Sequence, residues 1–222
     1  MPRPPFPARP NRATLGLTPD EWQTLERLKT PAQIQDFISA IPANFEPDGD
    51  TYLSVQQVLR QRRAHCIEGA LVAACALWIH GEPPLLWDLS AVRDVDHVVT
   101  LYRRGAAWGA ISKSNHSTLR FRDPVYRSLR ELALSYLHEY SNDRGEKTLR
   151  AYSVAWDLRS LPTRKWVDNP QNCLDLPLIL TNIRHYPLLP RGVRRLRPLE
   201  EMERRVKQFR QYDNPRKRSR PK

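Results

Sequence analysis

The stretch Cys66–Ile79, CIEGALVAACALWI, decides the fold. It is apolar on nearly all sides, contains three alanines in its second half, and is followed by His80-Gly-Glu-Pro-Pro84. A helix that is apolar all round is buried in a protein core, and glycine and proline commonly follow helix ends. We therefore predict a buried central helix from Cys66 to Ile79, around which the rest of the chain packs.

Three helix starts precede this central helix. Thr18, Thr30 and Ser54 each stand before an apolar pattern of helical spacing, and a proline directly follows the first two. Threonine and serine cap helix N-termini with their hydroxyl oxygen, and proline suits the first turn. Glu21, three residues after Thr18, completes a capping box. The N-terminal half of the domain is therefore predicted to be helical.

After the prolines at 83 and 84 the pattern changes to short runs that are typical of strands. The strand candidates are residues 85–89, 97–102 and 107–111, and residues 148–158 supply one more. Residues 103–105, Arg-Arg-Gly, form a hairpin-sized connection with glycine where a positive φ is needed. These runs predict a small antiparallel sheet, and with the helices they predict the α+β fold class.

Two more helices are predicted in the C-terminal half. Residues 124–140 return to helical spacing, and Asp123 stands before them as an N-cap. Residues 198–209 carry acids early and bases late, which suits the helix dipole, and their apolar residues recur at helical spacing. We expect a terminal helix there.

The net charge of +12 is carried by the two ends of the chain. Residues 191–222 hold 13 Lys and Arg against four Asp and Glu, residues 1–13 hold three Arg and no acid, and residues 14–190 are balanced. We divide the chain into a Pro-rich basic arm at 1–13, one domain at 14–190, and a basic C-terminal helix with a disordered tail at 191–222. The tail predicts an acidic protein or nucleic acid as partner, with simple solubility as the alternative.

Composition and motifs exclude several classes of protein. No run approaches the roughly 20 apolar residues of a membrane span, and residues 1–10 lack the apolar stretch of a secretory signal. We therefore expect a cytoplasmic protein with no membrane partner. The three cysteines form no CxxC pair, which argues against a disulfide scaffold. Neither HExxH-type spacing nor a GxxxxGKS, GxxxxGKT or GxGxxG loop occurs, so we predict no metal and no cofactor.

The positions of Cys66 and His97 favour thiol chemistry. Cys66 opens the buried helix, where the dipole and unpaired N–H groups favour the thiolate, and the basic residues within 62–65 add positive charge. The same N–H groups suit the oxyanion of a tetrahedral intermediate. His97, at the start of a strand, is the candidate base. Taken alone, Cys66 also fits a small buried hydrophobe, which is how we interpret Cys75.

Three motifs resemble the transglutaminase-like superfamily, which has a papain-like fold. They are RAHCIEGAL at 63–71, DHVV at 96–99 and WGAIS at 108–112. The resemblance covers about residues 54–114. It implies a papain-like α+β domain, with a helical N-terminal half packed on a small antiparallel sheet, in which Cys66 is the nucleophile and His97 the general base. The family's order is Cys, His, Asp, and Ser112 stands at the Asp position here.

Two residues are candidates for orienting His97. A carboxylate or an amide normally holds the second ring nitrogen of the base. A serine does this poorly, whereas Asn115 carries a side-chain oxygen like the amide of Cys-His-Asn sites. Asp96 is adjacent to His97 and, on a strand, points to the opposite face. We therefore favour Asn115 over Ser112.

Candidate substrate-binding residues belong to the hairpin and to the polar stretches that follow it within 112–126. Lys113 and Arg120 suit a carboxylate or carbonyl of the substrate, and the alternative is a solvated loop. Trp108 is the third candidate, with core packing as its alternative. Glu68 either caps a helix N-terminus or pairs with an arginine.

Together these residues predict a cysteine-dependent amide hydrolase or acyltransferase, that is, a peptidase, an amidase or a transglutaminase-type enzyme. Cys66 attacks an amide carbonyl, His97 moves the proton, and water or an amine resolves the thioester. The expected partner is an amide or peptide substrate. The alternative is a catalytically inactive protein of this fold that binds an acidic partner or nucleic acid through its basic tail.

Overall fold

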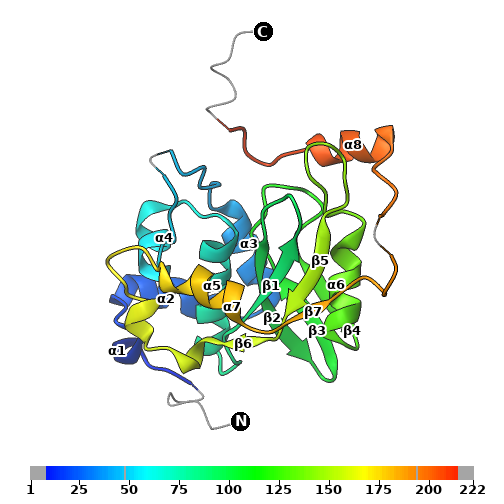
Figure 1. Cartoon of the computed structure of the whole chain (residues 1–222). Coiled ribbons are helices and arrows are strands. Elements are labelled where there is room, and N and C mark those ends of the chain that lie inside the picture. Colours follow the sequence, from blue (N-terminus) through cyan, green and yellow to red (C-terminus); the bar gives the residue numbers. More distant parts are fainter. Residues whose placement is uncertain (1–8, 48, 194, 215–222) are drawn as a thin grey trace.

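The computed structural model describes residues 9–47, 49–193 and 195–214 (Figure 1). The helices are α1 (Arg12–Leu15), α2 (Pro19–Glu26), α3 (Pro31–Ala40), α4 (Val55–Gln61), α5 (Cys66–Ile79), α6 (Leu129–Leu137), α7 (Asp175–Asn182) and α8 (Glu201–Gln208). The strands are β1 (Leu85–Ala91), β2 (His97–Arg104), β3 (Ala107–Ile111), β4 (Arg122–Tyr126), β5 (Leu149–Ser153), β6 (Trp156–Asp157) and β7 (His185–Pro187). The predicted α+β class is confirmed, with a helical N-terminal part ahead of the first strand.

Within the described residues the strands form one antiparallel sheet. Its order is β4-β3-β2-β1-β5-β7, and β6 pairs with β1 beside β5. β2 and β3 form the predicted hairpin, in which Gly105 takes a φ of 58° that glycine adopts without strain. Leu89 of β1 lies opposite His97 of β2. His97 therefore sits at the beginning of a central strand.

α5 is the buried central helix that its sequence predicts. Every residue after Cys66 in this helix is buried. It packs against β2 and β1 on one side and against α2, α3 and α4 on the other. The Thr100 hydroxyl of β2 donates to the Ala70 carbonyl at 2.6 Å, and Trp78 stacks on Trp166 with ring centroids 5.9 Å apart. Packing on both sides fixes where the N-terminus of α5 lies.

α6 covers the other face of the sheet (Figure 1). Its buried Leu132 and Tyr136 belong to a second core with Trp87 of β1 and Leu101 of β2. The fold thus has three layers, in which the sheet lies between the helices grouped around α5 and the single helix α6 (Figure 1).

The prediction of one helix over residues 124–140 is wrong in its first part. Arg122–Tyr126 is strand β4, and α6 starts after Ser128, which caps the helix in place of Asp123. β4 pairs with β3 at the edge of the sheet. An edge strand tolerates Pro124, because one side of it makes no ladder bonds. Hydrogen bonding to the free edge of β3 therefore outweighs the helical spacing of the apolar residues in this part of the sequence.

The C-terminal half contains elements that the sequence pattern does not predict. Residues 148–158 form two short strands, β5 and β6, in place of one, and both pair with β1. β7 extends the sheet beyond β5, and α7 precedes it. Elements this short carry too few hydrophobic repeats to give a periodic signal.

The ends of the chain differ in part from the predicted division. α1 begins inside the predicted arm, where Pro10 is buried. α8 confirms the terminal helix, although Met202 on it is 75% exposed. The predictions for residues 1–8 and 215–222 lie outside the described residues. Among the residues that are described, no helix combines the length and the apolar character needed to cross a membrane.

Candidate active site

Cys66 is the first residue of α5 and is partly exposed, unlike the rest of that helix. His65 precedes it as the N-cap in extended conformation, with φ −97° and ψ −168°. The first N–H groups of a helix have no partner within the helix and carry its positive dipole end. The thiol therefore lies at the end of α5 that favours a negative charge.

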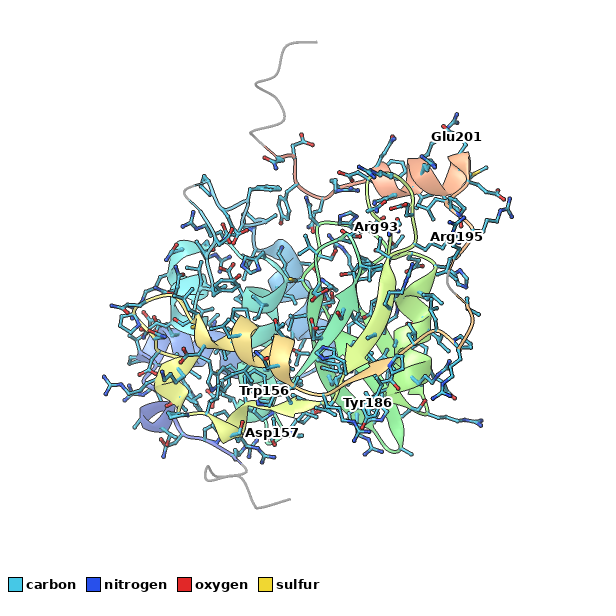
Figure 2. The ribbon with its side chains drawn as sticks, in the orientation of Figure 1. Arg93, Trp156, Asp157, Tyr186, Arg195 and Glu201 are labelled. Carbon is cyan, nitrogen blue, oxygen red and sulfur yellow. The ribbon has the colours of Figure 1, made fainter. Side chains whose placement is uncertain are left out.

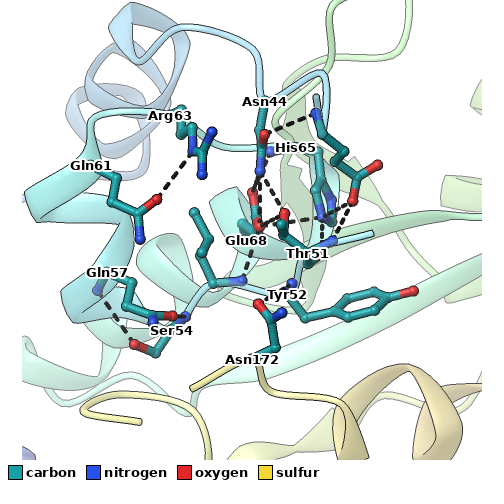
Figure 3. Close-up of polar contacts among 12 residues, drawn as sticks. Asn44, Thr51, Tyr52, Ser54, Gln57, Gln61, Arg63, His65, Glu68 and Asn172 are labelled. Atoms are coloured by element: carbon teal, nitrogen blue, oxygen red, sulfur yellow. Dashed lines mark hydrogen bonds and ion pairs between the residues drawn. The ribbon is translucent and has the colours of Figure 1, made fainter. Parts of the chain in front are cut away.

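Glu68 anchors this helix start from inside the protein. Its fully buried carboxylate accepts hydrogen bonds from the backbone N–H groups of His65 at 2.8 Å and Leu53 at 2.9 Å. The Thr51 hydroxyl at 2.9 Å and the Asn44 amide at 3.1 Å complete the set (Figure 3). A buried carboxylate is stable when its oxygens are satisfied in this way. Glu68 is thus the helix cap that the sequence offered as one interpretation.

The His65 ring is held between a carbonyl and two carboxylates. Its Nε2 lies 2.7 Å from the Thr51 carbonyl oxygen, 3.4 Å from Glu68 and 3.5 Å from Glu46 (Figure 3). A carbonyl only accepts, so Nε2 carries a proton. Burial alone would lower the pKa of His65, but the hydrogen bond and charge of Cys66 and the charge of Glu68 raise it to about 9. His65 is therefore a cation at neutral pH.

Ser112 orients His97. The Nε2 of His97 lies 2.7 Å from the Ser112 hydroxyl oxygen, which in turn lies 2.7 Å from the Leu119 carbonyl oxygen. The hydroxyl donates its hydrogen bond to that carbonyl, so it can only accept from His97 Nε2–H. This assigns the proton to Nε2 and leaves Nδ1 for the thiol. Both His97 and Ser112 are buried.

Gln35 of α3 fixes the backbone of Ser112. Its side-chain oxygen accepts from the Ser112 N–H at 2.9 Å, and its amide nitrogen donates to the Ser112 carbonyl at 3.0 Å. Gln35 is 77 residues away in the chain. A helix of the N-terminal half thus holds the residue that orients the base.

The two histidines lower the pKa of Cys66. Burial alone would raise it, but hydrogen bonds from His65 and His97 and their charges bring it well below its usual value. The other cysteines lack such partners. Burial raises the pKa of Cys75, and it raises that of Cys173 to about 12. Of the three thiols, only Cys66 has a pKa below the ordinary value.

A cavity of about 910 Å³ opens beside Cys66. His65, Cys66 and His97 line it, together with the loops 93–96, 113–116 and 140–144. Figure 2 shows Arg93, one of the lining residues, at the same end of the molecule as α8 and opposite Trp156 and Asp157 of β6. The thiol therefore faces a space large enough for part of a peptide or a small amide.

The structure corrects the preference for Asn115 as the residue that orients His97. The Asn115 side chain instead accepts from the Tyr212 N–H at 2.8 Å and donates to the Tyr212 carbonyl at 2.9 Å. Asn115 lines the cavity, but Ser112 occupies the position beside the base. As expected, Asp96 is turned elsewhere, and its carboxylate accepts from the Ala91 N–H at 2.7 Å.

The three predicted substrate-binding residues have different positions. Lys113 lines the cavity, but its ammonium donates to the Ile41 carbonyl and its side chain is buried. Burial lowers the pKa of Lys113 to about 8. Arg120 is outside the cavity lining and donates to the Gln211 side chain.

Trp108 is far from Cys66 along the sheet. It packs with the second core near the hairpin turn, and the Arg103 guanidinium lies 4.7 Å from its ring centroid. The alternative interpretation, core packing, is the correct one for Trp108, and it does not line the cavity.

Gln35 and Glu46 are among the residues of this site to which the sequence prediction assigned no role. Gln35 gives no local signal, because its partner is distant in the chain. Among the described residues, no group of three or more His, Cys, Asp or Glu side chains is arranged to hold a metal ion. The chain matches no protein-family model, and a search of curated proteins finds no match.

Proposed function

We propose that this protein is a cysteine-dependent amide hydrolase or acyltransferase of the transglutaminase-like, papain-like type. The observation that carries the proposal is the position of Cys66 at the start of a buried helix, between two histidines that lower its pKa and beside a cavity. A structural cysteine needs none of these features. The order of Cys66 and His97 along the chain also agrees with the resemblance to that superfamily.

In the acylation step the Cys66 thiolate attacks the carbonyl carbon of an amide, and a C–S bond forms. Backbone N–H groups of the first turn of α5 stabilise the oxyanion. The His97 imidazolium gives its proton to the leaving nitrogen, and the C–N bond breaks to leave a thioester. His97 then acts as a base and takes a proton from water or an amine, whose attack on the thioester releases the acid or the new amide and restores the thiolate.

The two histidines have different roles in the proposed reaction. The hydrogen bond and charge of Cys66, with the charge of Glu68, raise the pKa of His65 to about 9, so a positively charged His65 lies beside the thiolate and stabilises it. Ser112 orients the His97 ring through a hydrogen bond to Nε2 and, as a neutral residue, adds no negative charge beside it. This arrangement also accounts for a site in which serine stands where a carboxylate is usual.

The rate of alkylation of Cys66 by iodoacetamide, followed by mass spectrometry against pH, tests the proposal. We expect Cys66 to react as a thiolate well below pH of about 8.5, the value for an ordinary thiol. His97→Ala shifts this profile, and the buried Cys75 is the internal control. A profile of Cys66 like that of an ordinary thiol would overturn the proposal.

A second measurement detects the acyl-enzyme. The protein is incubated with a library of peptide amides and with hydroxylamine, which converts a thioester into a hydroxamate. We expect hydroxamate from the wild-type protein and none from Cys66→Ala. Equal amounts from both proteins would show that the acyl transfer does not use Cys66. The alternative function, binding of an acidic partner through the basic tail, depends largely on residues 215–222, which lie outside the described residues.

A further inference from the structure

The C-terminal segment 210–212 lies against the cavity loop 113–116. Arg210 and His116 form an antiparallel bridge, and the Gln211 N–H donates to the Asn115 carbonyl at 3.2 Å. In Figure 1 the chain leaves α8 and returns across the end of the molecule towards α3. The segment is therefore held as a short added strand, which is a common way for one chain to bind an extended peptide.

The Asn115 side chain recognises the backbone of residue 212. It accepts from the Tyr212 N–H at 2.8 Å and donates to the Tyr212 carbonyl at 2.9 Å. Both contacts are to main-chain groups, which every non-proline residue of an extended peptide offers. Asn115 can therefore bind a peptide whatever its side chain at this position.

The Tyr212 side chain occupies a matching site. Its hydroxyl donates to the Ser39 carbonyl at 2.9 Å, and the Lys113 ammonium lies 5.0 Å from the ring centroid. The Gln211 side chain donates to the same Ser39 carbonyl at 3.0 Å. A cation beside an aromatic ring and a carbonyl at its hydroxyl favour a tyrosine here.

This site adjoins the cavity that contains Cys66. Lys113 and Asn115 line that cavity, and so does Lys207 of α8, which donates to the Ser141 carbonyl. A second hollow of about 640 Å³ is lined by Tyr212 and shares Asn115 and Lys207 with the first. A peptide bound along Asn115 would therefore lie at the wall of the cavity that contains the thiol.

We propose that Ser39, Lys113 and Asn115 form a subsite for an extended peptide with a tyrosine, and that residues 210–212 of the chain occupy it as an internal competitor. The proposal rests on the proposed function in one respect, because it takes the Cys66 cavity as the place where the bound peptide reacts. The substrates of this site are then peptides. Arg210 and Gln211 are exposed, so the segment lies at the surface, where a peptide in solution can replace it.

The test is the binding of a fluorescein-labelled peptide with the sequence of residues 207–214, KQFRQYDN, measured by fluorescence anisotropy on the full chain. In the wild-type protein the tethered segment competes at a high effective concentration and weakens binding. In Tyr212→Ala the competitor is impaired, and we expect the peptide to bind about tenfold more tightly. Tyr212→Phe, which removes only the hydroxyl, gives an intermediate affinity.

Matched variants make the test specific. Phe209→Ala changes an exposed aromatic side chain directly before this segment, and the variant should bind the peptide as the wild-type protein does. Adding Asn115→Ala to Tyr212→Ala should weaken binding again by about tenfold, because both backbone contacts are lost. A labelled peptide with Ala in place of its Tyr should bind weakly. The proposal is overturned if Tyr212→Ala does not bind the peptide, or if Asn115→Ala leaves that binding unchanged.

The binding assay does not require a reactive thiol. Cys66→Ser in the Tyr212→Ala background should keep the peptide affinity. The contacts of Ser39, Lys113 and Asn115 with residues 211 and 212 do not involve Cys66. An ordinary alkylation profile of Cys66 therefore overturns only the proposed function. Loss of peptide binding with a reactive Cys66 overturns only the subsite.

Discussion

The Ser112 hydroxyl accepts a hydrogen bond from His97 Nε2 at 2.7 Å and donates its own hydrogen bond to the Leu119 carbonyl. This pair sets the direction of the His97 ring, because a hydroxyl with its proton committed can only accept. The neutral serine thus supplies the positioning that a carboxylate supplies in many Cys-His sites, without its charge. The charge is found instead beside His65, where two carboxylates lie within 3.5 Å of the ring.

Ser112→Ala should reduce the reactivity of Cys66. The change leaves His97 Nε2–H without its acceptor, so the ring loses its fixed direction and tautomer. We expect the alkylation rate of Cys66 at neutral pH to fall by about tenfold to a hundredfold, at the low end of what a positioned acid or base contributes. The rate is measured by mass spectrometry, with Ser114→Ala as a control in the same loop. Equal rates in Ser112→Ala and wild type would contradict the role given to Ser112.

Glu68→Gln should destabilise the fold. The buried carboxylate accepts from four residues, and an amide in its place turns an NH₂ group towards donors. We expect the free energy of unfolding to fall by about 3 kcal/mol, the upper range for disrupting hydrogen bonds to a buried charged group. Urea unfolding measures this, and Glu26→Gln at the exposed end of α2 is the control. A loss no larger than that of the control would count against the anchoring role.

Cys66 and His65 give the stability a defined dependence on pH. His65 has a raised pKa, so its contribution to the free energy of unfolding is complete below its ordinary pKa of 6.5 and is lost as pH rises through about 9. Cys66 has a lowered pKa, so its contribution is complete above its ordinary value of 9.0 and is lost as pH falls through the lowered value. Between pH 6.5 and 9 the slope from His65 opposes that from Cys66, whereas below 6.5 His65 adds no slope, so a further loss of stability on acidification comes from the thiol.

Urea unfolding of wild type and Cys66→Ser across this range checks the prediction. Because Cys66 is the main cause of the raised pKa of His65, Cys66→Ser removes both contributions, and the difference in free energy of unfolding between the two proteins should decrease as acidification below pH 6.5 protonates the thiolate. A difference that does not decrease on acidification would show that the folded protein does not stabilise the thiolate of Cys66.

Gly69→Ala should destabilise the protein although alanine favours helices. Gly69 lies within α5, and a Cβ there would come 2.3 Å from the Cβ of Lys113. The backbone of Lys113 would have to move, at a cost of about 1–3 kcal/mol for an overpacked core, which exceeds the gain of about 1 kcal/mol in helix propensity. Thermal unfolding measures the net loss, and an increase in Tm would show that the Lys113 loop yields freely.

Local sequence signals determined much of this fold. The capping boxes at Thr18, Thr30 and Ser54 start α2, α3 and α4 where the sequence predicts them, because a cap depends on residues three positions apart. The apolar run Cys66–Ile79 predicts a buried helix, since a helix without a polar face has no stable place at the surface. The sequence also placed His97 at the start of a strand, where β2 begins, and the family resemblance is what paired it with Cys66.

Tertiary structure alone decided between Ser112 and Asn115. Both follow β3, and their choice of partner depends on Gln35, 77 residues away from Ser112, and on Tyr212, 97 residues away from Asn115. Residues 122–126 became a strand for the same kind of reason, because the edge of β3 offered hydrogen bonds that a helix at this point would have left unmade. Short-range patterns fix caps and buried faces, whereas the partner of a polar side chain depends on which distant segments the packed chain brings beside it.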